Sequence, residues 1–207
     1  MNEAEPTLFV VDDEPSACKG VAALALSMGI PCETFLSAEA FLEAYDPSRA
    51  GCLLIDLRLK GMSGSELQGR LAALGCTLGV VLISAYADVP TAVKGMQNGA
   101  VALLEKPYRD DELTDAIRAA FELNRRLREE KARHAEVQRR LDSLTERERR
   151  LMEAILAGRP NRLIARDLSV SQRTVDRLRS SVFKKMHVDS AVALMRAVAD
   201  LWATDGD

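Results

Sequence analysis

The first 120 residues alternate short apolar runs with amphipathic stretches. Most of the runs are continuous and of strand length, which is typical of strands buried on both faces of a parallel sheet. The stretches between them have helical spacing, near residues 15–28, 37–45, 64–74 and 90–98, and a fifth begins near Asp110. The predicted strands are Thr7–Val11, Pro31–Phe35, Cys52–Asp56, Val80–Ser84 and Ala102–Glu105. This order predicts right-handed βαβ units and a doubly wound, five-stranded parallel sheet of the α/β class.

The fifth helical stretch shows no stop signal. From Asp110 to about Leu141 there is no Pro or Gly, so the sequence predicts one helix of roughly 45–50 Å. Apolar residues recur along it every seven positions, with breaks at Glu130 and His134. Heptad spacing is typical of paired helices. Two interpretations stay open: a solvated spacer helix, or a helix that pairs in a dimer.

From Leu144 onward every segment has a helical pattern. Thr145 and Glu148 have the spacing of a capping box, which predicts a helix start. A short helix over 161–168 and a longer one over 171–186 follow, and a last helix begins near residue 190. Two short helices joined by a three-residue turn have helix-turn-helix proportions.

These patterns predict three parts: an α/β domain over 1–123, a long linker helix over 124–142 that continues its last helix, and an all-α helix-turn-helix domain over 143–207. Charge supports the division. Residues 1–123 carry 9 Lys+Arg and 18 Asp+Glu, a net −9, whereas residues 144–207 carry 12 and 9, a net +3. An acidic front and a basic back indicate different partners, the rear one a polyanion.

Composition narrows the class of protein. With 47 % hydrophobic and 29 % charged residues in 207, the chain is not largely disordered. The longest uncharged stretch, between Arg70 and Asp88, holds 17 residues with several Gly and polar positions, short of the roughly 20 apolar residues of a membrane span. The acidic N-terminus is unlike a signal peptide, and the four cysteines form no C-x-x-C pair. We therefore expect a cytoplasmic protein with reduced cysteines and no membrane contact.

Chemical groups follow the predicted strands at the ends where parallel sheets bind ligands. These groups are three carboxylates, a hydroxyl and an ammonium, from Asp12, Asp13, Asp56, Ser84 and Lys106. Carboxylates so close repel one another unless a counter-charge is present. Mg²⁺ accepts one or two carboxylates and keeps sites for water and phosphate oxygens, so it suits this set.

One carboxylate of such a cluster can attack a phosphoryl group and become an aspartyl-phosphate. A metal and a lysine would offset charge on the phosphoryl oxygens, and a hydroxyl would bind one of them. A single strand-end Asp is more often a helix N-cap, and a single Lys is more often a surface charge. Their joint placement favours the phosphoryl site.

Four segments, VVDDE, LIDLRLKGMSG, LISA and LLEKP, together resemble the receiver domain of two-component response regulators over roughly residues 5–123. The resemblance implies that Asp56 is the phosphoacceptor. It also implies that Asp12, Asp13, Asp56 and the backbone carbonyl of Arg58 hold Mg²⁺, with Asp13 ahead of Asp12 as a direct ligand. Ser84 would be the switch hydroxyl and Lys106 the phosphate-pairing lysine, followed by a cis Lys106–Pro107 peptide.

Two positions depart from that pattern. Receivers usually carry Pro four residues after the acceptor, where this chain has Lys60. They usually carry an aromatic switch residue three positions before the lysine, where this chain has Leu103. Leucine has no ring or hydroxyl that could respond to a movement of Ser84. We therefore expect this change to affect how phosphorylation is coupled to DNA binding, and not the phosphorylation chemistry itself.

The segments LTERER, AGRPNRLIA and SVSQRTV resemble the four-helix DNA-binding domain of LuxR-type regulators over about residues 143–202. The whole chain thus resembles a FixJ/NarL-type response regulator. The resemblance implies that helix 171–186 enters the major groove of double-stranded promoter DNA and that helix 190–202 supports dimerisation. RNA polymerase is a further expected partner.

The residues of helix 171–186 favour DNA binding independently, because Lys and Arg outnumber acids and neutralise phosphates. Arg177 is suited to a guanine and Asp176 to a cytosine amino group, while Arg162 and Arg166 on the preceding helix are suited to backbone contacts. Leu178 and Ser181 differ from the residues common in the family, so the DNA sequence is not transferable. The predicted contacts of the helix are Arg173, Thr174, Asp176, Arg177, Ser180, Ser181, Lys184 and Lys185.

The sequence thus predicts a phosphorylation-controlled transcription regulator that accepts phosphate from a sensor histidine kinase. Phosphorylation would form a homodimer through the surface of residues 90–98 and 102–105. The receiver would catalyse only its own phosphorylation and dephosphorylation, so the protein is not an enzyme acting on an outside substrate. Two alternatives stay open: a constitutive DNA-binding regulator whose receiver serves only for dimerisation, and a phosphate-sink signalling adaptor.

Overall fold

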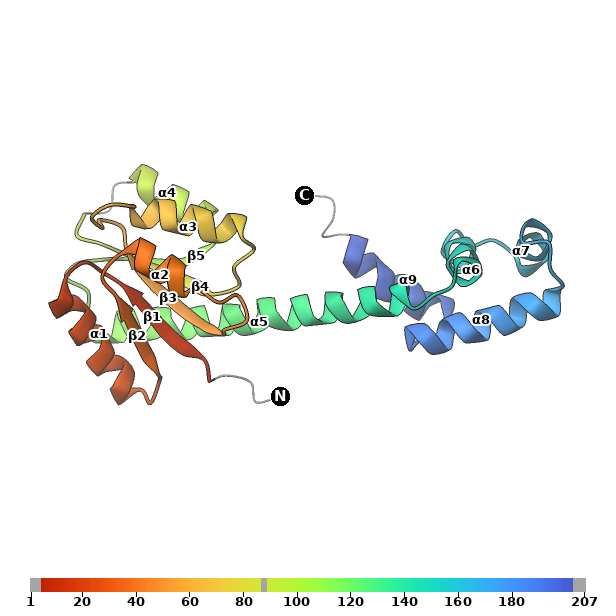
Figure 1. The fold of residues 1–207 in the computed structure, drawn as a ribbon, viewed down its shortest axis with the longest axis horizontal. Helices are drawn as coiled ribbons and strands as arrows, with labels where there is room; N and C mark the ends of the chain where they lie inside the picture. The colour runs from red at the N-terminus through yellow and green to blue at the C-terminus, as the bar shows by residue number, and fades with distance from the viewer. Residues whose placement is uncertain (1–4, 87–88, 203–207) are drawn as a thin grey trace. The chain divides into compact units, whose positions relative to one another are not determined.

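The computed structural model describes residues 5–86 and 89–202, so the last five residues of the predicted domain 143–207 lie outside it. By its internal contacts the chain divides into two compact units, Met1–Arg128 and Glu129–Asp207. Their elements are labelled in Figure 1. Within the described ranges, no helix has both the length and the apolar character needed to cross a membrane.

The first unit is built on a five-stranded parallel sheet in the order β2-β1-β3-β4-β5. The strands are β1 (Thr7–Val11), β2 (Cys32–Phe35), β3 (Gly51–Asp56), β4 (Gly79–Ser84) and β5 (Ala100–Glu105). Every residue of β1, β3 and β4 is buried, which explains their continuous apolar sequences. The predicted doubly wound α/β class is confirmed.

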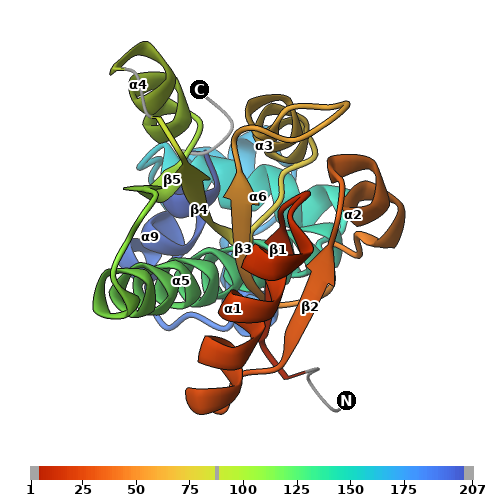
Figure 2. The same ribbon diagram turned by 90° about the vertical axis from the view of Figure 1, so that its left-hand side faces the viewer.

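Helices cover both faces of this sheet (Figure 2). One face packs on α1 and α5, and its core includes Leu8, Leu54 and Ile117. The other packs on α2 and α3, with α4 alongside, and its core includes Phe41, Leu53 and Leu67. The helices are α1 (Pro15–Ser27), α2 (Ala38–Ala44), α3 (Gly64–Ala73), α4 (Val89–Gln97) and α5 (Asp110–Asp142).

The sheet register brings the predicted site residues together. Val11 of β1 lies opposite Ile55 of β3, so the next residues, Asp12 and Asp56, are neighbours. Asp56 in turn lies opposite Ile83 of β4, one residue before Ser84. The strand order reverses on the two sides of β1, which is where open α/β sheets bind ligands.

The long helix α5 is held at both ends by different cores. In its first half, Asn124 is 2 % exposed. Its side chain accepts a hydrogen bond from the Gly51 amide at 2.9 Å and donates one to the Thr77 carbonyl at 2.6 Å. Towards its end, Val137 and Leu141 belong to the core of the second unit. The linker predicted over 124–142 is therefore partly built into each unit.

This packing also bears on the two interpretations of the heptad pattern, a solvated spacer helix or a helix that pairs in a dimer. Ala120 is buried in the first unit, and Val137, Leu141 and Leu144 are buried in the second. Most of the apolar seam is thus covered within the same chain, and Leu127 and His134 remain half-buried between the two ends. The intrachain packing of the seam favours the spacer interpretation, and pairing of α5 in a dimer stays a prediction.

The second unit adds four shorter helices, α6 (Glu146–Leu156), α7 (Asn161–Asp167), α8 (Gln172–Met186) and α9 (Ala191–Trp202). Thr145 and Glu148 form the predicted capping box of α6, and Ser171 caps α8. Leu151, Val175 and Val182 are fully buried at its centre. The predicted helix-turn-helix, α7 and α8 joined by a short turn, is present.

Candidate functional sites

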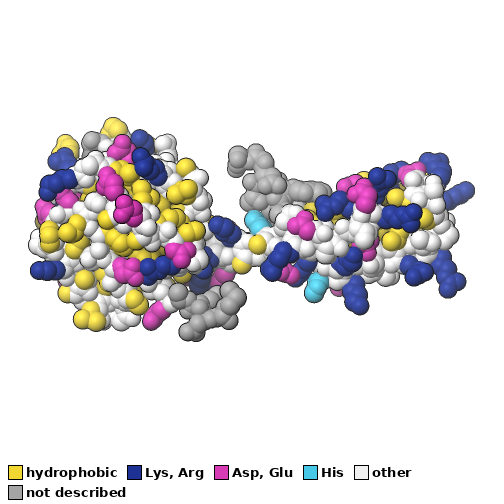
Figure 3. Space-filling view, in the orientation of Figure 1, with side chains coloured by type: hydrophobic (Ala, Val, Ile, Leu, Met, Phe, Trp, Pro, Cys, Tyr) yellow, Lys and Arg dark blue, Asp and Glu magenta, His cyan; other side chains and the backbone are white. Residues whose placement is uncertain are grey.

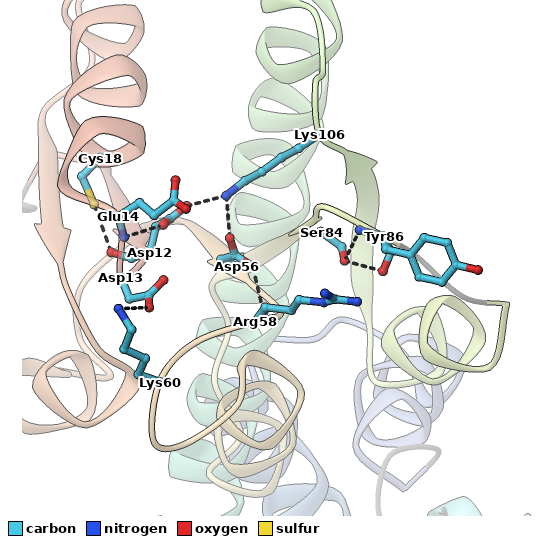
Figure 4. A network of polar contacts seen from close by, with 10 residues as sticks. All are labelled: Asp12, Asp13, Glu14, Cys18, Asp56, Arg58, Lys60, Ser84, Tyr86 and Lys106. Atoms are coloured by element: carbon cyan, nitrogen blue, oxygen red, sulfur yellow. Dashed lines mark hydrogen bonds and ion pairs between the residues drawn. The ribbon is translucent and has the colours of Figure 1, made fainter.

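The carboxyl ends of the strands form an acidic pocket around one lysine (Figure 4). Lys106 Nζ donates to Asp12 Oδ2 at 2.9 Å and to Asp56 Oδ2 at 2.5 Å. Both aspartates are buried, with 4 % and 7 % of their surface exposed. Burial alone would lower the pKa of Lys106, but its hydrogen bonds to Asp56 and Asp12 and their charges outweigh burial and raise that pKa. Lys106 is therefore a permanent cation beside Asp56.

Backbone amides fix the orientation of both aspartates. The Glu14 amide donates to Asp12 Oδ1 at 2.9 Å, and the Arg58 amide donates to Asp56 Oδ1 at 2.7 Å. Each carboxylate thus directs one oxygen to its own loop and the other to Lys106. An ionised carboxylate held in one orientation, beside a cation, is arranged for nucleophilic attack on a phosphorus atom.

Asp13 has a different partner. Lys60 Nζ lies 3.0 Å from Asp13 Oδ2, and Figure 4 shows this pair beside the Lys106 cluster. The sequence marked Lys60 only as a departure from the receiver pattern, and it gave no sign of this contact. The two residues are 47 positions apart, so only the fold brings them together.

The chemistry of the donor set fits Mg²⁺. Carboxylate and carbonyl oxygens are the hard ligands that this ion takes, and one or two protein carboxylates are enough. In the part of the chain that the structure describes, however, no three acidic, His or Cys side chains are grouped closely enough to enclose a metal. Ammonium groups occupy the positions next to the carboxylates instead: Lys106 beside Asp12 and Asp56, and Lys60 beside Asp13.

The predicted switch residues lie at the ends of β4 and β5. Ser84 is 1 % exposed. Its hydroxyl donates to the Tyr86 carbonyl at 2.7 Å and accepts from the Tyr86 amide at 3.2 Å, so it is not bonded to Asp56 (Figure 4). Leu103 lies opposite Leu82 and packs partly buried against the core. The Lys106–Pro107 peptide is cis, as the receiver resemblance implied.

The second unit presents a basic surface built on α8, and Figure 3 shows many Lys and Arg side chains over this part of the chain. Val175 and Val182 are fully buried, which leaves the opposite side of the helix to solvent. Thr174 is half-buried, and its hydroxyl shares a 2.9 Å hydrogen bond with that of Ser171. The predicted contacts that are exposed on α8 are Arg173, Asp176, Arg177, Ser180 and Lys184.

Two predicted DNA contacts, Ser181 and Lys185, face α6. The Ser181 hydroxyl donates to Glu148 Oε1 at 2.6 Å, and Lys185 Nζ donates to Glu148 Oε2 at 2.7 Å. Glu148 is 5 % exposed and also completes the cap of α6. Because Ser181 and Lys185 are four residues apart, they lie on the same flank of α8, and that flank faces α6. Both residues thus take part in the packing of α8 on α6, and their use as DNA contacts stays a prediction.

Asn161 is a functional candidate that the sequence did not reveal. It begins α7, and its side-chain amide donates to Asp176 Oδ1 at 3.2 Å. Its oxygen accepts from Arg179 at 3.2 Å, and the Arg179 guanidinium lies 5.2 Å from the centre of the Phe183 ring. The signal that could have found Asn161 is its place in the sequence, because it is the first residue of α7, the helix that precedes α8. Asn161 thereby orients Asp176 on the exposed side of α8.

The two arginines predicted as backbone contacts lie on α7. Arg162 and Arg166 are both exposed, and the Nε atom of Arg166 lies 3.6 Å from Asp167. Exposed ion pairs of this length contribute little free energy. Both side chains are therefore available to phosphates.

The buried position of Glu148 leads to a prediction about stability. Burial would raise its pKa, but hydrogen bonds from Lys185, Ser181 and Thr145 lower it from 4.5 to about 2. A carboxylate with a lowered pKa stabilises the fold above the unfolded pKa, and this stabilisation is lost as the pH falls from about 4.5 to about 2. We expect Glu148→Gln to lower the free energy of unfolding at pH 7 by about 2 kcal/mol and to flatten this acid dependence.

Urea unfolding followed by fluorescence of Trp202, the only tryptophan, measures this effect. The matched control is Glu146→Gln, because the Glu146 side chain is 71 % exposed and pairs only with Arg150 among the ion pairs described. We expect the control to change the free energy of unfolding by less than about 0.5 kcal/mol. Equal losses in the two variants would contradict the role given to the buried carboxylate.

The fold and the two sites define a class of protein: a response regulator, with a receiver domain followed by a helix-turn-helix domain. Family models agree. Residues 8–118 match the response regulator receiver domain, and residues 142–198 match the LuxR family of bacterial regulatory proteins. The chain belongs to the response regulators that carry a LuxR-type DNA-binding domain. A receiver implies a histidine kinase as partner, and a LuxR-type domain implies DNA binding.

Similar proteins share this organisation over nearly their whole length. The response regulator protein TmoT of Ectopseudomonas mendocina is 34 % identical over 201 residues, which cover 97 % of this chain and 91 % of TmoT. The transcriptional regulatory protein FixJ of Azorhizobium caulinodans is 36 % identical over 196 residues, 95 % of this chain and 92 % of FixJ. Among solved structures, the response regulator StyR is 37 % identical with a TM-score of 0.84, covering 95 % of this chain and 99 % of StyR.

Proposed function

We propose that Asp56 accepts a phosphoryl group from a sensor histidine kinase and that this modification controls how the second unit binds promoter DNA. The observation that carries the proposal is the contact of Lys106 with both Asp12 and Asp56 at the carboxyl ends of the strands. A buried carboxylate would be costly without such a partner. The same lysine is positioned to offset the charge of a phosphoryl group.

In the proposed transfer, an oxygen of Asp56 attacks the phosphorus of a phosphohistidine. An O–P bond forms, the N–P bond breaks, and the imidazole nitrogen keeps the electron pair and takes up a proton. The ammonium group of Lys106 pairs with the phosphoryl oxygens and offsets their negative charge during the transfer. Hydrolysis reverses the modification: water attacks the same phosphorus, the bond from phosphorus to the Asp56 oxygen breaks, and inorganic phosphate leaves while the carboxylate is restored. The receiver thus catalyses only its own phosphorylation and dephosphorylation.

Mg²⁺ is the cofactor that we propose for this site. Asp12, Asp13, Asp56 and the backbone carbonyl of Arg58 would hold it. When bound, it supplies positive charge to the phosphoryl oxygens and thereby favours the transfer. The protein contributes the orientation of the carboxylates, which the amides of Glu14 and Arg58 already fix.

Ser84 connects the site to the receiver surface. Its hydroxyl now donates to Tyr86, and in the proposed active form it donates to a phosphoryl oxygen instead. The Tyr86 carbonyl then loses its partner, and the backbone at Tyr86 rearranges. Val93 and Met96 of α4 are each 49 % exposed, which suits a surface that pairs two receivers.

Dimerisation would place two copies of α8 on neighbouring half-sites of double-stranded DNA, about one helical turn apart. The proposed base contacts are Arg177 and Asp176, with Arg173, Thr174, Ser180 and Lys184 beside them and Arg162 and Arg166 on phosphates. Val192 and Met195 of α9 are 60 % and 50 % exposed, which suits contact between the two DNA-binding domains. RNA polymerase is the proposed further partner at the promoter.

Capture of genomic DNA by the full chain, with and without Mg²⁺ and a small phosphodonor, tests the proposal. We expect footprints on specific sequences and at least about tenfold tighter binding after phosphorylation, the effect of about 1.4 kcal/mol. Equal affinity in both forms would favour a constitutive regulator whose receiver only dimerises. Absence of a protected sequence at two salt concentrations would favour a phosphate-sink adaptor, because a specific complex survives salt better than non-specific binding.

A further inference from the structure

The ion pair between Lys60 and Asp13 sets this receiver site apart from the pattern that its sequence resembles. Lys60 lies in the loop between β3 and α3, and Asp13 directly follows Asp12 at the end of β1. Their charged atoms are 3.0 Å apart, and the side chains are 88 % and 16 % exposed. The lysine therefore reaches from solvent onto a carboxylate at the rim of the pocket (Figure 4).

The charges of the pocket are nearly balanced without a metal. Asp12, Asp13 and Asp56 supply three negative charges, and Lys106 and Lys60 supply two positive ones. Lys106 pairs with the buried carboxylates of Asp12 and Asp56, and Lys60 pairs with the carboxylate of Asp13. A divalent cation that approaches Asp13 meets an ammonium group already at ion-pair distance, and like charges this close repel strongly.

Lys60 is the ammonium that can leave at low cost. Lys106 is 23 % exposed and bonds two buried carboxylates, whereas the Lys60 side chain is largely in water. The loop that carries Lys60 is held at another point, since the Met62 amide donates to Glu39 Oε1 at 2.9 Å. Release of Lys60 therefore requires a side-chain movement and leaves that anchor in place.

We propose that Lys60 is a tethered counterion of Asp13 that competes with Mg²⁺ for this carboxylate. The inference rests on the magnesium site of the proposed function. Binding of the ion requires Lys60 to swing away from Asp13, so the lysine lowers the affinity of the pocket for Mg²⁺. It also makes that affinity depend on ionic strength, because salt screens an exposed ammonium.

Calorimetric titration of Mg²⁺ into the full chain, without a phosphodonor, measures this competition. We expect Lys60→Met to bind Mg²⁺ about fivefold more tightly than the natural chain, the size of an exposed ion-pair effect. The difference should shrink towards 1 M salt, where the screening length is about 3 Å. Lys60→Arg should stay close to the natural chain, because it keeps the charge.

A control variant separates local competition from net charge. Lys94→Met removes the same charge from an exposed position on α4, and we expect it to leave Mg²⁺ affinity unchanged. Equal affinities of the natural chain and Lys60→Met, or an equal gain in Lys94→Met, would overturn the role of Lys60 while leaving the magnesium site intact. Absence of Mg²⁺ binding in the natural chain and in Lys60→Met would overturn the magnesium site itself.

Discussion

Asp56→Asn is expected to reduce phosphate uptake from a small phosphodonor by at least about 100-fold, because an amide oxygen is neutral and a poor nucleophile. The substitution keeps the size of the side chain. It also leaves Lys106 a carboxylate partner in Asp12, at 2.9 Å, so the pocket retains its fold. Incorporation of labelled phosphate in the presence of Mg²⁺, followed over time, measures the loss.

The control for this prediction is Asp115→Asn. Asp115 is 80 % exposed on α5 and lies 4.0 Å from Arg118, so its loss should leave phosphate uptake unchanged. Far-UV circular dichroism of both variants verifies that they are folded. Uptake by Asp56→Asn at the natural level would mean that another carboxylate of the pocket, Asp12 or Asp13, is the acceptor.

Gly79→Ala is expected to lower the stability of the first unit by about 3 kcal/mol, the upper part of the usual range for overpacking. Gly79 begins β4 at the point where α5 crosses the sheet. A methyl group on it would overlap the backbone of Ala120, including its carbonyl. Backbone atoms of a buried helix have no rotamer by which to move away, so the helix itself must shift.

Urea unfolding resolves this loss by unit, because all three tyrosines lie in the first unit and the only tryptophan lies in the second. Tyrosine fluorescence should report the destabilisation, while tryptophan fluorescence should change little. The matched control is Gly69→Ala within α3, where an added methyl meets nothing within 4 Å. Alanine is favoured over glycine in a helix by up to about 1 kcal/mol, so a gain is expected there. A loss of similar size in both variants would contradict the packing argument.

The position of Leu103 bears on how phosphorylation at Asp56 would change the receiver surface. Ser84 is bonded to Tyr86 in the loop after β4, and Leu103 is packed beside Leu82. With no hydroxyl or ring on Leu103, the Tyr86 segment, which is hydrogen-bonded to Ser84, is the route by which we propose that phosphorylation moves the backbone after β4. The coupling proposed above therefore depends on the backbone of that segment more than on a swinging side chain.

The sequence by itself determined the order of the elements and the grouping of Asp12, Asp56 and Lys106 at the carboxyl ends of the strands. Alternating apolar runs predicted all five strands, and β1 has the predicted bounds Thr7–Val11. The capping box of α6 followed from a local signal, since Thr145 and Glu148 are only three positions apart. The motifs around Asp56 and Lys106 placed both at strand ends, where parallel topology brings them together.

Only the tertiary structure decided which side chains meet across distant segments. Ser181 and Lys185 have the composition of DNA contacts, yet their flank of α8 packs on Glu148. Lys60 pairs with Asp13, and Asn124 ties α5 to the start of β3. Periodicity and capping report the environment of a residue along its own helix or strand, whereas these contacts depend on how separate helices and loops pack. For that reason the fold class and the grouping of Asp12, Asp56 and Lys106 were predictable, and the partners of Lys60, Ser181 and Lys185 were not.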